Sequence, residues 1–213
     1  MTDTSPLETV IPRIIQHFSE KNAAREKALS ASRTIIRMSA NAIRAVHRRE
    51  FDEADQILDA ARIVRDEALV ALRGHPDVAY AGFLHDAQKE YAEARATLAL
   101  LSGGSLPTPE ELGVEYPAWL NGIAEAIGEL RRAILDRLRS GNFEGCELLL
   151  QAMDDIYSAL VTIDFPDAMT GGLRRSTDQA RGILEKTRGD LTMAIVQRDT
   201  LLAVLPPPVT DLE

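Results

Sequence analysis

Cysteine and aromatic residues are scarce in this sequence of 213 residues, which contains one cysteine and only 5% aromatic side chains. The lone Cys146 cannot form an intramolecular disulfide or a cysteine metal site, and such residues usually pack as small apolar groups in reducing compartments. β-Rich folds rely on aromatic and β-branched residues, so the composition argues against an all-β protein. It favours a helical protein of the cytoplasm.

Long apolar runs and an excess of basic residues are also missing. The longest nearly unbroken apolar stretch, residues 96–101, is far shorter than the roughly 18 residues that a membrane span needs. Asp3 and Glu8 stand where a secretory signal has basic residues, so we expect neither a signal nor a membrane anchor. The net charge of −9 excludes an overall positive field. Nucleic acid would therefore have to bind through a local group of basic residues or through metal ions.

Apolar residues recur every three or four positions along most of the chain, which predicts amphipathic helices. Pro12 is tolerated in a first helical turn, so residues 7–18 are compatible with the beginning of the first helix. The predicted long helices span residues 23–49, 51–73, 78–101, 117–139, 143–163 and 173–205.

Proline and glycine residues separate these predicted helices. Residues 108–111 (Thr-Pro-Glu-Glu) form a capping box, which predicts a short helical turn that ends at Gly113. Residues 164–172 contain one proline and paired glycines and are predicted to form a loop. We therefore predict an all-α fold: one domain over residues 1–213, an antiparallel bundle of about seven helices, with a flexible tail at 206–213.

The sequence contains two pairs of carboxylates, and the two members of each pair lie on the same face of one predicted helix. Glu90 and Glu93 are three residues apart and Glu125 and Glu129 are four apart, so the members of each pair project from one face. A solvated face paired with basic residues is the simpler interpretation. If the two helices are neighbours, however, converging carboxylates would need a divalent cation, and an all-oxygen site selects Mg²⁺ or Mn²⁺. The residues alone leave both interpretations open.

A basic stripe follows the first long helix. Its four arginines occupy a sector about 60° wide and are Arg33, Arg37, Arg44 and Arg48. They can be a solvated face that pairs with the surplus acids, or they can bind phosphate groups.

Residues 89–94 (KEYAEA) are similar to the QEYVEA-type motif of translin-associated factor X (TRAX), and residues 122–130 (GIAEAIGEL) to its GVADLTGEL-type motif. With these segments the sequence resembles the translin superfamily, in particular its prokaryotic, archaeal-type branch and factor X. The resemblance extends from about Arg25 to Asp190. It also rests on Arg25-Glu26-Lys27, Ser32-Arg33, Ser39, His47-Arg48 and residues 164–178.

The resemblance implies a seven-helix fold and a hollow homo-oligomer, typically of eight subunits. It also implies a metal-dependent endoribonuclease site for single-stranded RNA, whose acidic positions fall on Glu90, Glu93, Glu125 and Glu129. These four residues are predicted to bind Mg²⁺ or Mn²⁺, with one of them as general base, while the basic stripe positions RNA phosphates. Glu125 departs from the factor X motif, which has Asp there. The alternatives are a non-catalytic oligomer that binds single-stranded RNA or DNA, as translin does, and a helical scaffold.

Overall fold

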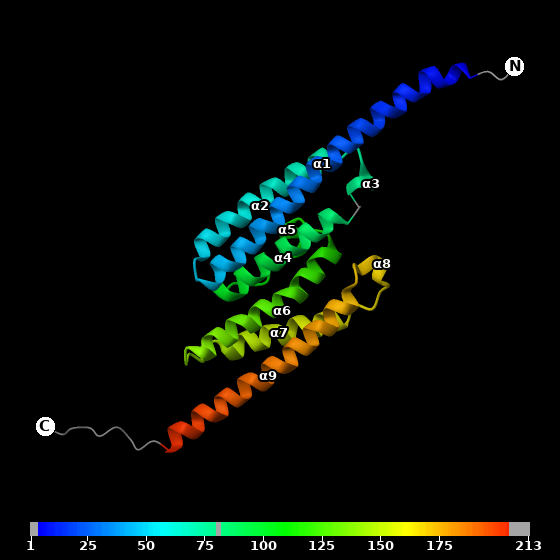
Figure 1. Ribbon diagram of the computed structural model, residues 1–213. Coiled ribbons are helices and arrows are strands. Elements are labelled where there is room, and N and C mark those ends of the chain that lie inside the picture. Colours follow the sequence, from blue (N-terminus) through cyan, green and yellow to red (C-terminus); the bar gives the residue numbers. More distant parts are fainter. Residues whose placement is uncertain (1–3, 80–81, 205–213) are drawn as a thin grey trace.

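The computed structural model describes residues 4–79 and 82–204, which form helices joined by turns (Figure 1). The predicted all-α fold is confirmed. The tail at 206–213 lies outside the described residues. Within them the nine helices are α1 (Ser5–His47), α2 (Phe51–Ala71), α3 (Pro76–Ala79), α4 (Phe83–Ser102), α5 (Pro109–Leu112), α6 (Tyr116–Arg139), α7 (Cys146–Val161), α8 (Asp167–Thr170) and α9 (Leu173–Val204).

Five of the six long helices agree with the predicted ones to within about five residues at each end. The first, α1, starts at Ser5 and not near residue 23, and it continues without a break through Pro12, so residues 7–18 are its beginning. Two short helices were not predicted. Gly82, with φ of 92°, precedes α4, so the segment predicted to start at residue 78 is divided into α3 and α4. The segment 164–172, predicted as a loop, contains the single turn α8, which Gly171 ends in the left-handed conformation. The described residues thus hold nine helices where about seven were predicted.

The long helices pack in two groups that meet where α4 contacts α6 (Figure 1). One apolar core lies among α1, α2 and α4 and includes Ile35, Leu58 and Tyr91. The other lies among α6, α7 and α9 and is built from residues such as Ile127 and Met153. Cys146 is buried in this second core, as expected of a small apolar side chain.

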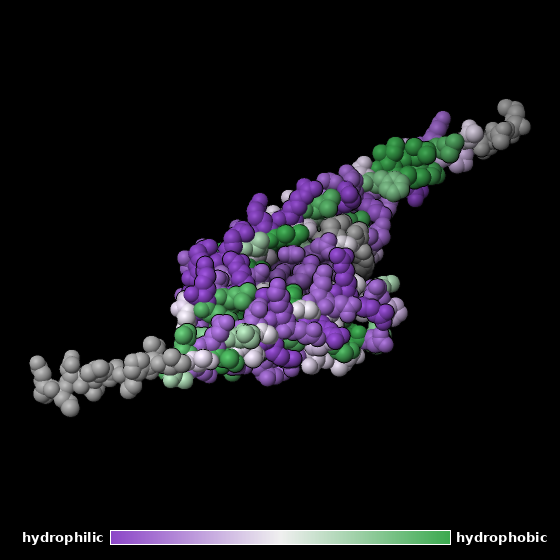
Figure 2. All heavy atoms as spheres, turned by 60° about the horizontal axis from the view of Figure 1, so that its bottom comes forward, coloured by the Kyte–Doolittle hydropathy of each residue, from purple (hydrophilic) through white to green (hydrophobic). Residues whose placement is uncertain are grey.

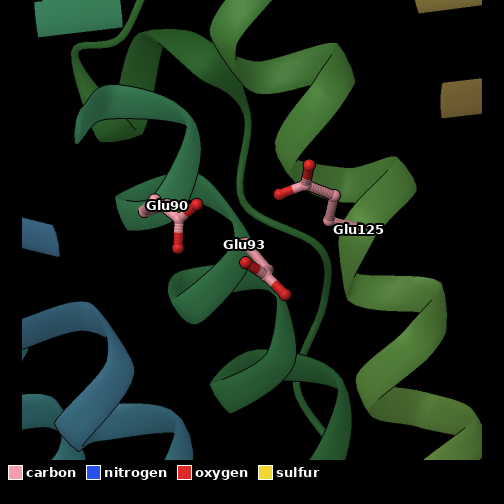
Figure 3. Close-up of side chains that lie close together, drawn as sticks. All are labelled: Glu90, Glu93 and Glu125. Carbon is pink, nitrogen blue, oxygen red and sulfur yellow. The ribbon is translucent and has the colours of Figure 1, made fainter. Parts of the chain in front are cut away.

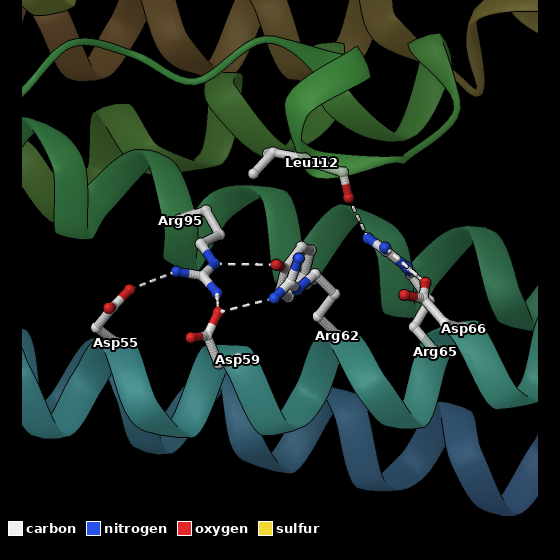
Figure 4. A network of polar contacts seen from close by, with 8 residues as sticks. Asp55, Asp59, Arg62, Arg65, Asp66, Arg95 and Leu112 are labelled. Carbon is white, nitrogen blue, oxygen red and sulfur yellow. Dashed lines mark hydrogen bonds and ion pairs between the residues drawn. The ribbon is translucent and has the colours of Figure 1, made fainter.

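Polar contacts fix α2 against α4 (Figure 4). The guanidinium of Arg95 donates hydrogen bonds to Asp55 at 2.6 Å and to Asp59 at 2.7 Å, and its Nε donates to the Tyr91 hydroxyl at 2.9 Å. The buried Arg65 of α2 donates to the carbonyl oxygen of Leu112 at the end of α5. These contacts hold Tyr91, which is 1% exposed, in the core.

The first turns of α1 extend beyond the bundle, and its buried residues begin only at Ala28 (Figure 1). Large apolar side chains cover one side of this extension and form the green patch on the projecting rod in Figure 2. They are between 40% and 60% exposed: Leu7, Val10, Ile11, Ile14, Ile15 and Phe18. Despite this patch, none of the described helices has the length and apolar character required to cross a membrane.

Candidate metal centre and nucleic-acid interface

The contact between α4 and α6 is close because α6 presents a glycine to the backbone of α4. A Cβ atom added to Gly122 would lie 2.7 Å from the carbonyl oxygen of Lys89 and 2.9 Å from both the Ala92 Cβ and the Glu93 nitrogen. The neighbouring Ala126 is fully buried and also small. The helices can therefore approach each other at residues 89–93 and 122–126, where the predicted carboxylates lie.

Three of the four predicted ligands converge at this contact (Figure 3). One carboxylate oxygen from each of Glu90, Glu93 and Glu125 lies within 4.8 Å of the others. Glu90 and Glu93 come from α4, Glu125 comes from α6, and Glu93 is the most deeply buried of the three. The two helices are thus neighbours, which is the condition that a shared cation site requires.

The electrostatics of the cluster show an excess of negative charge. Burial, together with the charges of Glu90, Glu125 and Glu129, raises the pKa of Glu93 from 4.5 to about 8, and Lys89 opposes part of this shift. Because carboxylates that share a site repel one another, Glu93 keeps its proton at neutral pH unless a cation offsets the charge. A nearby divalent cation would favour its ionised form.

Lys89 places an ammonium group against two of the carboxylates. Its Nζ lies 2.7 Å from Oε1 of Glu125 and 3.4 Å from Oε1 of Glu90. Burial acts to lower the pKa of Lys89, but the contacts with Glu125 and Glu90 outweigh burial and raise it above the usual value. The side chain is therefore positively charged at neutral pH.

Glu129, the fourth predicted ligand, has a different partner. Nε2 of His47, on α1, lies 2.5 Å from Oε2 of Glu129, and a guanidinium nitrogen of Arg132 lies 3.7 Å from the same oxygen. The hydrogen bond from His47 is the main reason that the pKa of Glu129 is lowered, and Arg132 contributes to the shift. The structure places Glu129 beside the group of three but not within it, so its role as a ligand stays a prediction.

The group of three fits a hard divalent cation by the chemistry of its donors. All three are carboxylate oxygens, which Mg²⁺ and Mn²⁺ prefer. Mg²⁺ usually keeps several water ligands and takes few from the protein. Glu90, Glu93 and Glu125 could therefore hold one ion and leave positions for water and phosphate.

Sequence reasoning did not place His47 or Lys89 in this site, and it included Lys89 only among the basic residues that pair with the acids on a solvated face. Lys89 had a local signal, since it stands next to Glu90 and four residues before Glu93 on one helix. His47 stands next to Arg48 of the basic stripe, and its position in the sequence gives no signal of a carboxylate partner. Its contact with Glu129 joins residues 82 positions apart and follows from the packing of α1 near α6.

The four arginines of the basic stripe are exposed, three of them on α1 and Arg48 at its C-cap. Arg48 forms ion pairs with Glu50 at 2.5 Å and Glu53 at 3.9 Å, as the ion-pair interpretation expects. Arg44 donates a hydrogen bond to Asn41. Among residues 4–79 and 82–204, no ion pair involves Arg33 or Arg37. These two residues are the best placed of the four to meet an external anion.

Comparison with known proteins gives relatives over most of the chain, although no family model matches it. The crystal structure of AfC3PO, from Archaeoglobus, superposes with a TM-score of 0.82 and 35% identity, covering 88% of this chain and 98% of the other. The chain belongs to the translin superfamily. A second superfamily structure, that of AfC3PO with duplex RNA, has a TM-score of 0.77 at 35% identity and covers 88% of this chain and 97% of the other.

Two more relatives extend the comparison. The uncharacterised protein MJ0175 of Methanocaldococcus jannaschii is 31% identical over 185 residues, which are 85% of this chain and 81% of the relative. Apo-NeC3PO, from Nematostella, has a TM-score of 0.78 at 21% identity, over 86% of this chain and 96% of the other, and supports the fold alone. The translin-like fold implied by the sequence motifs is therefore confirmed.

Proposed function

We propose that this protein is a Mg²⁺- or Mn²⁺-dependent endoribonuclease of the cytoplasm, which cleaves single-stranded RNA inside a homo-oligomeric shell. The observation that carries the proposal is the convergence of Glu90, Glu93 and Glu125 at the α4–α6 contact. The comparison supports RNA as the ligand, because the related AfC3PO has been solved in complex with duplex RNA, whereas the preference for single strands rests on the sequence motifs alone.

Different residues of the chain have different proposed roles. Glu90, Glu93 and Glu125 would hold the ion, with Glu129 as a predicted fourth ligand. A bound Mg²⁺ or Mn²⁺ supplies activation of water and neutralisation of phosphate charge. One of the four carboxylates would accept the proton of the attacking water. Arg33 and Arg37, with Arg44 and Arg48 as further members of the stripe, would bind phosphates along the RNA.

Cleavage assays with Mn²⁺ test the metal site. The wild type should cut end-labelled single-stranded RNA, and Glu93→Gln and Glu125→Gln should each abolish cutting. Glu67→Gln, which alters an exposed carboxylate on α2, is the matched control and should keep full activity. Duplex RNA and single-stranded DNA of the same sequence establish the preferred substrate. Unchanged cleavage in both site variants would overturn the assignment.

The same preparations distinguish the non-catalytic alternative. A translin-like binding protein would show no cleavage, but its binding of oligonucleotides would weaken with salt and on Arg37→Gln. Fluorescence anisotropy at several salt concentrations measures both effects. A protein that neither cleaves nor binds would instead be a helical scaffold.

The exposed apolar face at the start of α1 supports the proposed self-association. Leu7, Ile11, Ile14 and Phe18 follow one another at alternating steps of four and three, the spacing of helices that pack side by side. Most helical stability in proteins comes from packing of the apolar face, so an exposed apolar face of this kind indicates a partner. Homo-oligomers bury such faces against other copies of the chain.

Light scattering coupled to gel filtration tests this part of the proposal. The wild type should run as an oligomer, and we propose an octamer. A double variant, Ile11→Asp with Ile14→Asp, should reduce the mass. The control, Thr9→Asp with Gln16→Asp, adds the same charge away from the apolar face and should not. A monomeric wild type would refute the shell.

A further inference from the structure

Lys89 stands out because its ammonium group is part of the carboxylate cluster. It contacts Glu125 on α6 and Glu90 on its own helix, α4, and only 21% of its side chain is exposed. Its contact with Glu125 uses Oε1 at 2.7 Å, on the same carboxylate that would hold the divalent cation. The cluster therefore already contains a resident positive charge.

An ammonium group and a divalent cation compete for such a cluster. A cation bound to Glu125 would lie within a few ångström of the Lys89 nitrogen. At that distance two positive charges repel one another strongly in a partly buried site. The lysine stem is flexible and has four carbons, so the ammonium can leave Glu125 without any movement of the backbone. The displaced group would still lie beside the metal, where a substrate phosphate would bind.

We propose that Lys89 is a built-in counter-ion that neutralises Glu125 and Glu90 while no metal is bound. When a divalent cation binds to these carboxylates, the Lys89 ammonium moves away from them and contacts a phosphate group of the RNA. This inference rests on the proposed function. It adds that metal occupancy and RNA binding are coupled through one side chain. Lys89 would be a positioning residue that weakens metal binding and strengthens RNA binding only when metal is present.

Calorimetric titration with Mn²⁺ in the absence of RNA tests the first half. Lys89→Gln removes the competing charge, so this variant should bind Mn²⁺ about tenfold more tightly than the wild type, which corresponds to about 1.4 kcal/mol. Lys89→Arg keeps the charge and should bind Mn²⁺ as the wild type does. Lys186→Gln removes a lysine from an exposed position of α9 and is the control for net charge.

Binding of a 2′-O-methyl oligonucleotide, followed by anisotropy, tests the second half. In Mn²⁺ the Lys89→Gln variant should bind it several-fold more weakly than the wild type, whereas in EDTA the two proteins should bind equally, because Lys89 is then held by Glu125. A merely structural role for Lys89 would produce the same loss with and without metal, and would overturn the inference.

The outcomes separate this inference from the proposed function. If the wild type binds Mn²⁺ but Lys89→Gln binds it no more tightly, the counter-ion role is wrong and the metal site stands. If the wild type binds Mn²⁺ and shows the Lys89 effects but cleaves no RNA, the nuclease function is wrong and the counter-ion role stands. A wild type that binds no Mn²⁺ overturns both.

Discussion

Glu93 is expected to destabilise the folded protein at neutral pH when no metal is bound. Its carboxyl group is buried beside Glu90 and Glu125, and its pKa is raised from 4.5 to about 8. The folded state therefore holds a proton that the unfolded chain loses near pH 4.5. A group of this kind stabilises the fold fully below its unfolded pKa, and this stability is lost as the pH rises toward the folded pKa.

The magnitude follows from the two pKa values. Each pH unit between them changes the free energy of unfolding by about 1.4 kcal/mol, so the wild type loses about 3 kcal/mol between pH 4.5 and pH 7. The side chain at position 93 is uncharged at every pH in Glu93→Gln, so the free energy of unfolding of this variant should not fall in this way. Near pH 7 the variant should therefore melt about 6–12 °C above the wild type, and near pH 4.5 the two should melt together.

Thermal unfolding followed by circular dichroism, in EDTA and across this pH range, measures the effect. Glu67→Gln, on the exposed surface of α2, is the control and should follow the wild type at every pH. Added Mn²⁺ should raise the melting temperature of the wild type but not that of Glu93→Gln. A constant difference between Glu93→Gln and wild type from acid to neutral pH would refute the proposed protonation of Glu93.

Four further substitutions test the packing and the electrostatics around the site. In denaturant titrations, Gly122→Ala should destabilise the protein by about 1–3 kcal/mol, because the new methyl group would clash with the α4 backbone. Gly128→Ala is the matched control: its methyl group meets open space, so it should stabilise α6 by about 0.5–1 kcal/mol. Asn121→Ala should cost about 1–3 kcal/mol in the same assay, because the buried amide donates to the carbonyl of Thr170 at 2.8 Å and holds α8. His47→Gln should raise the pKa of Glu129, since His47 is the main cause of its lowering; NMR titration of the carboxylate that shows no rise would contradict that assignment.

The long helices were predictable because each carries an apolar stripe with a period near 3.6 residues over four turns or more. On α6 this stripe runs through Ile123, Ile127 and Ile134, and all three are buried. Helices α3 and α8 have four residues each, which is too short for any periodicity to show. The position of α8 depends instead on its ends: Pro166 before it and the left-handed Gly171 after it.

The candidate site was predictable only in part, because spacing along one helix says nothing of the helix it contacts. Glu90 and Glu93 could be placed on one face, but their approach to Glu125 depends on the packing of α4 against α6. The chain does contain a local signal for that packing, the small residues Gly122 and Ala126 beside Glu125. The contact of His47 with Glu129 has no such signal, because it depends on how α1 crosses the bundle.

The four carboxylates differ in what neutralises them, and this difference determines where a cation gains most. Glu90 and Glu125 share the ammonium of Lys89, and Glu129 is held by His47 and Arg132. Glu93 has no ion pair or hydrogen bond from its carboxylate among the described residues, and it is the one whose pKa rises to about 8. A proton there takes the place of a counter-ion. An approaching divalent cation would therefore gain its strongest new ligand by displacing that proton, and its affinity should rise with pH until Glu93 is fully ionised.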